Sequence, residues 1–154
     1  MRSDLQFYED IVVGVPERFG AYEVTREEVI DFASRYDPQD FHLDDEAAAR
    51  GPFGTLAASG WNTAAISMRL LCDNLISRQT SLGGAGVEEI RWTRPVLPGD
   101  VLSLEVTVTE KRRSRSRPDV GLMKLFQRMF NQRGEEVMRL TSTGMIKVRH
   151  PEVP

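Results

Sequence analysis

The feature that most constrains this chain is a long apolar helix predicted from Ser59 to about Arg78. Ser59 is a suitable N-cap, because its hydroxyl can accept a hydrogen bond from a free amide of the first turn. Such a helix would be roughly 27 Å long, so the rest of a small domain must wrap around it. Ile66 and Leu70 widen its apolar face, so we expect burial on more than one side. The face itself follows i, i+3, i+4, i+7 spacing and comprises Trp61, Ala64, Ala65, Met68, Leu71, Cys72 and Leu75.

Composition describes an ordinary globular protein. A length of 154 residues fits one domain, which we predict over 1–154 with an N-terminal arm at 1–19 and a tail at 149–154. The net charge of −3 gives no reason to expect nucleic acid or an anionic membrane as a partner. No secretory signal or membrane-spanning run is recognisable, so we expect a cytoplasmic protein. The single cysteine, Cys72, excludes an internal disulfide and is predicted to be a reduced core thiol.

Short helices are predicted before the long one. After a first strand ending near Val24, Thr25 and Glu28 form a capping box, in which Glu28 would reach back to the amide of the cap residue. The helix that follows should end at Asp37, because Pro38 disfavours the helical conformation of the residue before it. Its predicted apolar face comprises Val29, Phe32, Ala33 and Tyr36. Asp44 can cap a further short helix that ends before Gly51-Pro52.

After the long helix the apolar pattern changes from a helical period to alternation. Strands are predicted over 87–96, 102–109, 120–131 and from Met138 to Val148, with a turn at 131–134. Leu102, Leu104, Val106 and Val108 should share the inner face of the second of these strands. Consecutive strands with short links favour an antiparallel meander. The predicted fold class is therefore α+β, a curved antiparallel sheet wrapped around one long helix.

Asp37 and His42 are the main candidates for chemistry. They lie in one loop, and a carboxylate and an imidazole brought together on one water molecule can perform acid–base catalysis. The alternative is structural: Asp37 caps or turns the chain, and His42 is incidental. Spacing alone favours this structural interpretation. The other histidine, His150, lies in a proline-rich tail and is expected to be solvated.

Three other candidate sites are weaker. His42, Asp44 and Asp45 could bind a metal, but adjacent acids before a helix are more often caps, so we expect no metal site. Ser59 does not lie in a Gly-x-Ser-x-Gly elbow, so capping is a better interpretation than nucleophilic catalysis. The basic stretch at 111–117 could attract an acidic cofactor, but the end of a solvated hairpin is the preferred interpretation.

These residues together resemble a known motif. Asp37-x4-His42, followed by Asp44, Ala47-Ala48, Phe53-Gly54, Leu56-Ala57 and Ser59-Gly60, is similar to the hydratase motif of MaoC-like dehydratases, the (R)-specific enoyl-CoA hydratases of the hotdog fold. The similarity covers most of the chain, from about Tyr22 to the turn at 98–100 and more loosely to the last strand. The hotdog fold, a sheet wrapped on a central helix, agrees with the architecture predicted above.

The resemblance implies reversible addition of water to a trans-2-enoyl-CoA thioester. Asp37 and His42 would activate the water, and the Gly60 amide at the helix N-terminus would bind the thioester oxygen as it gains charge. It requires no cofactor, since CoA is part of the substrate, and it implies a homodimer or a larger even oligomer. The residues expected to contact the substrate are Phe53, Ser59, Trp61, Gly84 and Gly86.

The sequence also departs from the motif. Gln39-Asp40 stands where Asn-Pro is frequent in the family, and a nearby Asp40 carboxylate would raise one carboxyl pKa. Met68 stands where related hydratases have a serine. Two other functions stay open: a hotdog acyl-CoA thioesterase, which would release free CoA, and a non-catalytic subunit that binds acyl-CoA.

Overall fold

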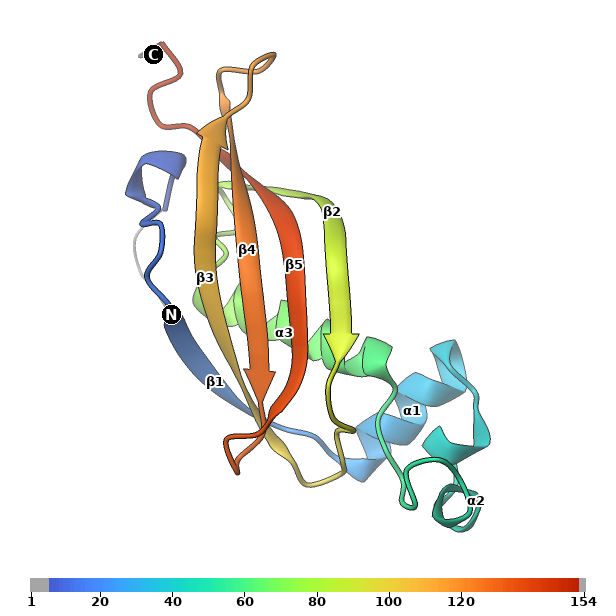
Figure 1. Cartoon of the computed structure of the whole chain (residues 1–154). Coiled ribbons are helices and arrows are strands. Elements are labelled where there is room, and N and C mark those ends of the chain that lie inside the picture. The colour runs from blue at the N-terminus through green and yellow to red at the C-terminus, as the bar shows by residue number, and fades with distance from the viewer. Residues whose placement is uncertain (1–5, 153–154) are drawn as a thin grey trace.

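The computed structural model describes residues 6–152, which form a five-stranded antiparallel sheet and a set of helices (Figure 1). The helices are η1 Tyr8–Asp10, α1 Arg26–Tyr36, η2 Asp40–His42, α2 Asp45–Ala49 and α3 Gly60–Asn74. The strands are β1 Glu17–Glu23, β2 Ser81–Trp92, β3 Val101–Arg113, β4 Val120–Phe130 and β5 Glu136–Lys147. The predicted α+β class, a sheet around one long helix, is confirmed.

The strand order is β1-β3-β4-β5-β2, with every neighbouring pair antiparallel. The predicted meander is therefore correct only for β3, β4 and β5, and it is wrong for β2, which pairs with β5 at the far edge. The segment between β2 and β3 leads from one edge of the sheet to the strand beside the opposite edge. It is fixed by backbone hydrogen bonds from Ala58 to Val96 (2.8 Å) and from Val24 to Asp100 (2.8 Å).

Helix α3 lies across one face of the sheet and packs mainly against β1 and β3 (Figure 1). It begins after Ser59 as predicted, but it ends at Asn74 rather than near Arg78. The predicted buried face is only partly correct. The buried residues of α3 are Asn62, Thr63, Ile66, Ser67, Leu70 and Leu71. Trp61, Ala65, Met68 and Cys72 form an exposed stripe instead, because periodicity identifies apolar stripes without showing which stripe the sheet covers.

The orientation of α3 also shows that the prediction for the single cysteine was wrong. Cys72 is exposed in the isolated chain rather than buried in the core. The core between α3 and the sheet is formed by larger apolar side chains, including the fully buried Leu102 and Leu104 of β3 and Met129 of β4. The alternation predicted for β3 is thus confirmed.

The caps of the shorter helices are confirmed in most details. The Thr25 hydroxyl accepts from the Glu28 amide at 3.1 Å, and the Asp44 carboxylate accepts from the Ala47 amide at 2.8 Å. The Glu28 carboxylate, however, accepts from the Tyr22 hydroxyl at 3.0 Å, which ties α1 to β1. The apolar face of α1 is also narrower than predicted: Val29 and Ala33 are buried, whereas Tyr36 is exposed.

Strand β2 differs from its predicted range. It begins at Ser81 rather than at Val87, and it ends at Trp92 rather than at Val96. Glycines at positions 83, 84 and 86 weaken the strand signal of the sequence, but pairing with β5 extends the strand through them. Strands β4 and β5 agree with their predicted ranges, and Asn131 closes the turn between them by accepting from the Gly134 amide at 3.1 Å.

The segments near both ends of the described chain lie together beside the β3–β4 hairpin (Figure 1). The Lys111 ammonium donates to the carbonyls of Tyr8 (3.2 Å) and Ile11 (2.7 Å), and the Arg149 amide donates to the Glu9 carboxylate (3.0 Å). The basic stretch at 111–117 therefore forms a hairpin end, as predicted, and Lys111 also holds the N-terminal segment. Strand β1 begins at Glu17, inside the predicted arm; residues 1–5 of the arm and 153–154 of the tail lie outside the described residues.

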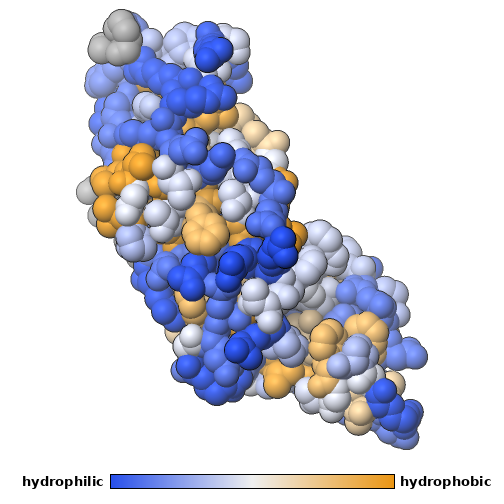
Figure 2. Space-filling view, in the orientation of Figure 1, coloured by the Kyte–Doolittle hydropathy of each residue, from blue (hydrophilic) through white to orange (hydrophobic). Residues whose placement is uncertain are grey.

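Hydrophilic residues cover much of the molecular face seen in Figure 2, with apolar groups scattered among them. Within residues 6–152, no helix is long and apolar enough to cross a membrane.

Candidate active site

Three turns of the chain converge where α1 ends and α3 begins. Asp37 is the C-cap of α1, His42 is the last residue of η2, and Ser59 is the N-cap of α3. The structure thus brings together the carboxylate and the imidazole that the sequence placed in one loop, and it adds the serine that opens the long helix.

His42 is almost fully buried, with 4% of the residue exposed. Its Nδ1 lies 2.6 Å from the Ala57 carbonyl oxygen. Because a carbonyl oxygen can only accept, Nδ1 carries a proton and donates it to this bond. In the neutral ring, Nε2 is therefore a free acceptor, and it faces the Asp37 Oδ2 atom at 3.4 Å. The imidazole is held in the tautomer that presents a basic nitrogen to the carboxylate side of the site.

The Asp37 carboxylate accepts two side-chain hydrogen bonds. The Ser59 hydroxyl donates to Oδ2 at 2.7 Å, and the Gln39 side-chain amide donates to Oδ1 at 2.7 Å. Burial raises the pKa of this carboxyl, but the two hydrogen bonds and the nearby His42 ring outweigh burial and hold the pKa below its ordinary value. For Asp37 the pKa shift is downward, opposite to the rise expected beside a close second carboxylate. Gln39, rather than Asp40, contacts Asp37.

Two aromatic rings pack near the imidazole. The Phe41 ring meets the His42 ring edge-on at 4.6 Å between centroids, and the Phe53 ring lies 6.3 Å away in a stacked orientation. Phe53 itself is 43% exposed, so one side of its ring borders solvent. The predicted contact residue Phe53 thus lies beside His42.

Gly60 occupies the first position of α3, directly after the serine that holds Asp37. The Gly60 amide makes no hydrogen bond to any described residue, as is usual for the first amides of a helix. The Trp92 indole lies against this glycine and donates from Nε1 to the Gly60 carbonyl at 2.8 Å. A Cβ atom on Gly60 would lie 2.5 Å from the Trp92 ring, so the close packing of this indole requires glycine here.

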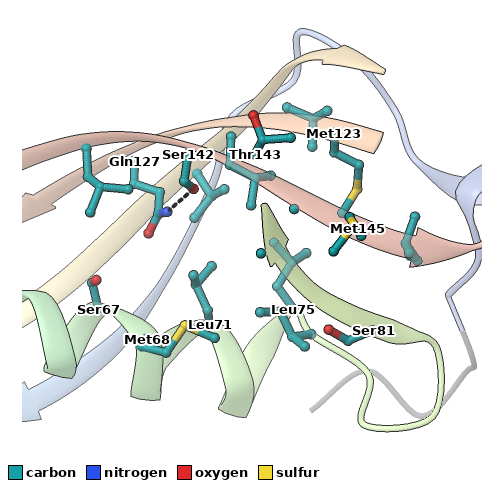
Figure 3. Close-up of a pocket in the computed structure, with 18 of the residues that line it drawn as sticks. Ser67, Met68, Leu71, Leu75, Ser81, Met123, Gln127, Ser142, Thr143 and Met145 are labelled. Atoms are coloured by element: carbon teal, nitrogen blue, oxygen red, sulfur yellow. Dashed lines mark hydrogen bonds between the residues drawn. The ribbon is translucent and has the colours of Figure 1, made fainter. Parts of the chain in front are cut away.

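A cavity of about 670 Å³ extends from the first turns of α3 along the inner face of the sheet. One wall is a row of α3 residues that runs from Trp61 to Leu75, and the other is formed by residues of β2, β3, β4 and β5 (Figure 3). Residues of the N-terminal segment, among them Ile11 and Val12, complete the lining. The predicted contact residues Trp61, Gly84 and Gly86 line this cavity. The structure therefore places Ser59 and Phe53 at the Asp37–His42 pair, and the other three along the adjacent cavity.

A family model for the MaoC like domain matches residues 12–125. The chain belongs to the MaoC-like domain family. A solved MaoC-like dehydratase from Rhodospirillum rubrum is 43% identical, covers 94% of this chain and 98% of its own, and superposes with a TM-score of 0.87. The structural likeness confirms the hotdog fold expected from the motif.

Two further relatives carry functional names. A 3-hydroxybutyryl-CoA dehydratase from Methylorubrum extorquens is 32% identical over 118 residues, covering 71% of this chain and 70% of the relative. The unliganded R-hydratase PhaJ1 from Pseudomonas aeruginosa is 25% identical, covers 93% of this chain and 86% of its own, and has a TM-score of 0.75. The family is thus one of dehydratases and hydratases.

The two acids considered as metal ligands have other partners in this MaoC-like domain. Asp44 caps α2, and Asp45 pairs with Arg26. Within residues 6–152, no group of three potential ligand side chains lies close enough together to hold a metal ion.

Several residues of the site could not be identified from the motif. Gln39 was noted only as a departure, yet it binds Asp37 directly. The Ala57 carbonyl fixes the His42 tautomer, and a backbone atom leaves no trace in the side-chain pattern. Gln127 lines the cavity from the inner face of β4, between the buried Leu125 and Met129. A polar residue at an inward position of a buried strand is a signal that the sequence does carry.

Proposed function

We propose that this MaoC-like domain adds water reversibly to the double bond of trans-2-enoyl-CoA thioesters. The proposal rests on one observation: two proton acceptors, Asp37 Oδ2 and His42 Nε2, face each other at 3.4 Å. Neither residue lines the apolar cavity, but Ser59, which binds Asp37, lies two residues before the cavity-lining Trp61. The lowered pKa keeps Asp37 ionised, and the bond from Nδ1 to Ala57 leaves Nε2 without a proton in the neutral ring. A water molecule that donates to both atoms would satisfy both.

In the proposed reaction, the water oxygen bonds to C3 of the enoyl group while a proton passes from that water to the Asp37–His42 pair. The pair then returns a proton to C2, so that the elements of one water molecule are added across the double bond. Dehydration is the reverse sequence. An acid–base group within hydrogen-bond reach of the proton that it transfers is the geometric requirement for this chemistry.

Electron density from C3 attack accumulates on the thioester oxygen before C2 is protonated. The free Gly60 amide would donate to this oxygen, supported by the partial positive charge at the N-terminus of α3. The acyl chain would then extend from Gly60 into the cavity along α3, whose wall is mostly apolar. This placement assigns Trp61, Gly84 and Gly86 to the acyl chain, and Ser59 to the support of Asp37.

We also propose that the domain works as a homodimer or larger even oligomer. β2 is an edge strand of the sheet, and its Val87 is 59% exposed. The neighbouring stripe of α3 exposes Trp61 (58%) and Met68 (49%). Unpaired strand edges beside exposed apolar groups are surfaces that proteins usually cover by association.

The direct test is hydration of crotonyl-CoA and longer enoyl-CoAs, followed as loss of the conjugated-thioester absorbance. Asp37→Asn and His42→Gln should each lower turnover about 10²–10⁴-fold, the usual contribution of a positioned acid or base. Since the two residues act on one water, the double variant should be little worse than the worse single variant. Melting temperatures of the same preparations separate lost chemistry from lost folding.

Asp40→Asn and His150→Gln are matched controls, because both side chains lie outside the pair and are exposed. Each should hydrate enoyl-CoA at the wild-type rate. Full activity of Asp37→Asn or His42→Gln would contradict the mechanism. Release of free CoA from saturated acyl-CoA would instead identify a thioesterase, and tight binding without turnover would identify a non-catalytic acyl-CoA subunit.

A further inference from the structure

The cavity along α3 is not uniformly apolar. Gln127 of β4 and Ser142 of β5 project from the sheet, and Ser67 of α3 lies on the opposite wall (Figure 3). Leu125 and Leu140, which line the same cavity beside this group, are buried apolar residues. The polar side chains of Gln127 and Ser142 are not needed to hold the strands together, because backbone atoms make the hydrogen bonds between strands.

The Gln127 side chain is incompletely satisfied. The residue is 3% exposed, and its Nε2 donates to the Ser142 hydroxyl at 3.3 Å. Its Oε1 is buried and has no hydrogen-bond partner among the described residues. Buried polar atoms are nearly always paired, so an unpaired carbonyl oxygen that lines a cavity marks a place for a donor. The Ser67 hydroxyl cannot be that donor, because it donates to the Ala64 carbonyl at 2.7 Å.

We propose that the cavity selects acyl chains that carry a hydroxyl group, which binds at Gln127 and Ser142. This inference rests on the proposed function and names its substrate class. The acyl hydroxyl would donate to Gln127 Oε1 and accept from the Ser142 hydroxyl, whose oxygen already accepts from Gln127 Nε2.

Other polar groups fit Gln127 and Ser142 less well than a hydroxyl does. A keto oxygen has no proton to give to Oε1, so it would leave this atom unpaired. A carboxylate or an ammonium would have to lose its hydration in a pocket without a charged partner beside Gln127, and an isolated buried charge is strongly disfavoured. A hydroxyl is uncharged and can both donate to Gln127 Oε1 and accept from the Ser142 hydroxyl.

The position of the hydroxyl along the chain follows from the helix. Ser67, opposite Gln127, lies seven residues after Gly60, which is about 10 Å along the axis of α3 at about 1.5 Å per residue. An extended chain covers about 3.3–3.6 Å per three bonds, so a thioester carbonyl at Gly60 is roughly nine bonds from this group. A hydroxyl near the ninth or tenth carbon of the acyl chain is therefore the preferred substituent.

The test compares trans-2-decenoyl-CoA with its 10-hydroxy derivative. We expect wild-type kcat/KM to favour the hydroxylated substrate by about 10–100-fold, the effect of leaving a buried polar group unpaired. Gln127→Leu should reverse this preference, and Ser142→Ala should weaken it. Gln79→Leu is the matched control, because Gln79 is exposed in the loop before β2. Gln79→Leu should hydrate crotonyl-CoA at the wild-type rate and keep the wild-type preference.

These measurements separate the inference from the proposed function. Equal kcat/KM for the two ten-carbon substrates, or a hydroxyl preference that survives in Gln127→Leu, would overturn the assignment of Gln127 while hydration of crotonyl-CoA still supports the hydratase. If no enoyl-CoA is hydrated, calorimetric Kd values for decanoyl-CoA and 10-hydroxydecanoyl-CoA decide the point. Tighter binding of the hydroxylated compound, lost in Ser142→Ala, supports the polar subsite; equal binding refutes it.

Discussion

Ser59 has two functions in one hydroxyl group. It accepts from the Trp61 amide at 3.2 Å as the cap of α3, and it donates to Asp37 at 2.7 Å. The sequence identified the cap, since serine before an apolar run is a helix start signal. The bond to Asp37 could not be predicted, because it depends on how the loop after α1 folds back over α3. Stability of the helix start and ionisation of the carboxylate are thus linked.

Ser59→Ala should therefore destabilise the protein in two distinguishable ways. Loss of the cap costs about 0.5–2 kcal/mol at any pH. Loss of the donor also moves the pKa of Asp37 up towards its ordinary value. A depressed carboxyl pKa stabilises the fold above the unfolded value of about 3.9, and this stabilisation is lost as pH falls through the folded pKa. The difference in unfolding free energy should thus be larger at pH 7 than at pH 3.

Urea unfolding at both pH values measures this difference. Ser34→Ala serves as the control, because the Ser34 hydroxyl is exposed and donates only to the Ile30 carbonyl within α1. A destabilisation by Ser59→Ala that is the same at pH 3 and pH 7 would show that Ser59 acts only as a cap.

At the scale of elements, α3 shows what periodicity can and cannot determine. Its start, its length within about a turn, and its place against the sheet follow from the apolar pattern. Its orientation about its own axis does not. Thr63 and Ser67 are buried while the larger apolar residues Trp61 and Met68 are exposed, and the apolar pattern alone does not distinguish these two sides of the helix.

The contact between α3 and β2 depends on the absence of a side chain at Gly60. Gly60→Ala should lower the unfolding free energy by about 1–3 kcal/mol, the usual effect of overpacking, because its Cβ would overlap the Trp92 ring. Removing that ring in the double variant Gly60→Ala/Trp92→Leu should recover part of the loss. A double-mutant cycle by thermal unfolding measures the coupling. Strictly additive effects of the two substitutions would show that the contact with Trp92 is not what requires glycine at position 60.

At the scale of the whole molecule, the sequence predicted the layers correctly but not the order of strands. The local alternation in β3 to β5 was sufficient to predict those three strands and their hairpins. The position of β2 was not predictable, because it depends on pairing with β5 across a large separation in sequence. The motif around Asp37 and His42 located the candidate site, and its catalytic role stays a prediction.

The exposed edge of β2 gives the prediction for assembly. Light scattering at micromolar concentration should show about twice the 17.4 kDa of one chain, or a larger even multiple. Val87→Lys should shift the protein towards monomer, because a lysine on an edge strand opposes pairing with another edge. Val13→Lys is the control, as Val13 is exposed in the segment before β1. A wild-type particle with the mass of one chain would refute the oligomer.

The strand order also determines when each strand can pair during synthesis of the chain. β2 has one partner among the described strands, β5, and β5 is the last of these strands to leave the ribosome. β2 therefore cannot pair, and its part of the cavity wall cannot form, until β5 has been synthesised. β3 and β4 can pair as soon as they emerge. An unpaired strand is an aggregation hazard during such a delay. The glycines at positions 83, 84 and 86, which made β2 hard to recognise, also lower its tendency to pair with the wrong edge in that interval.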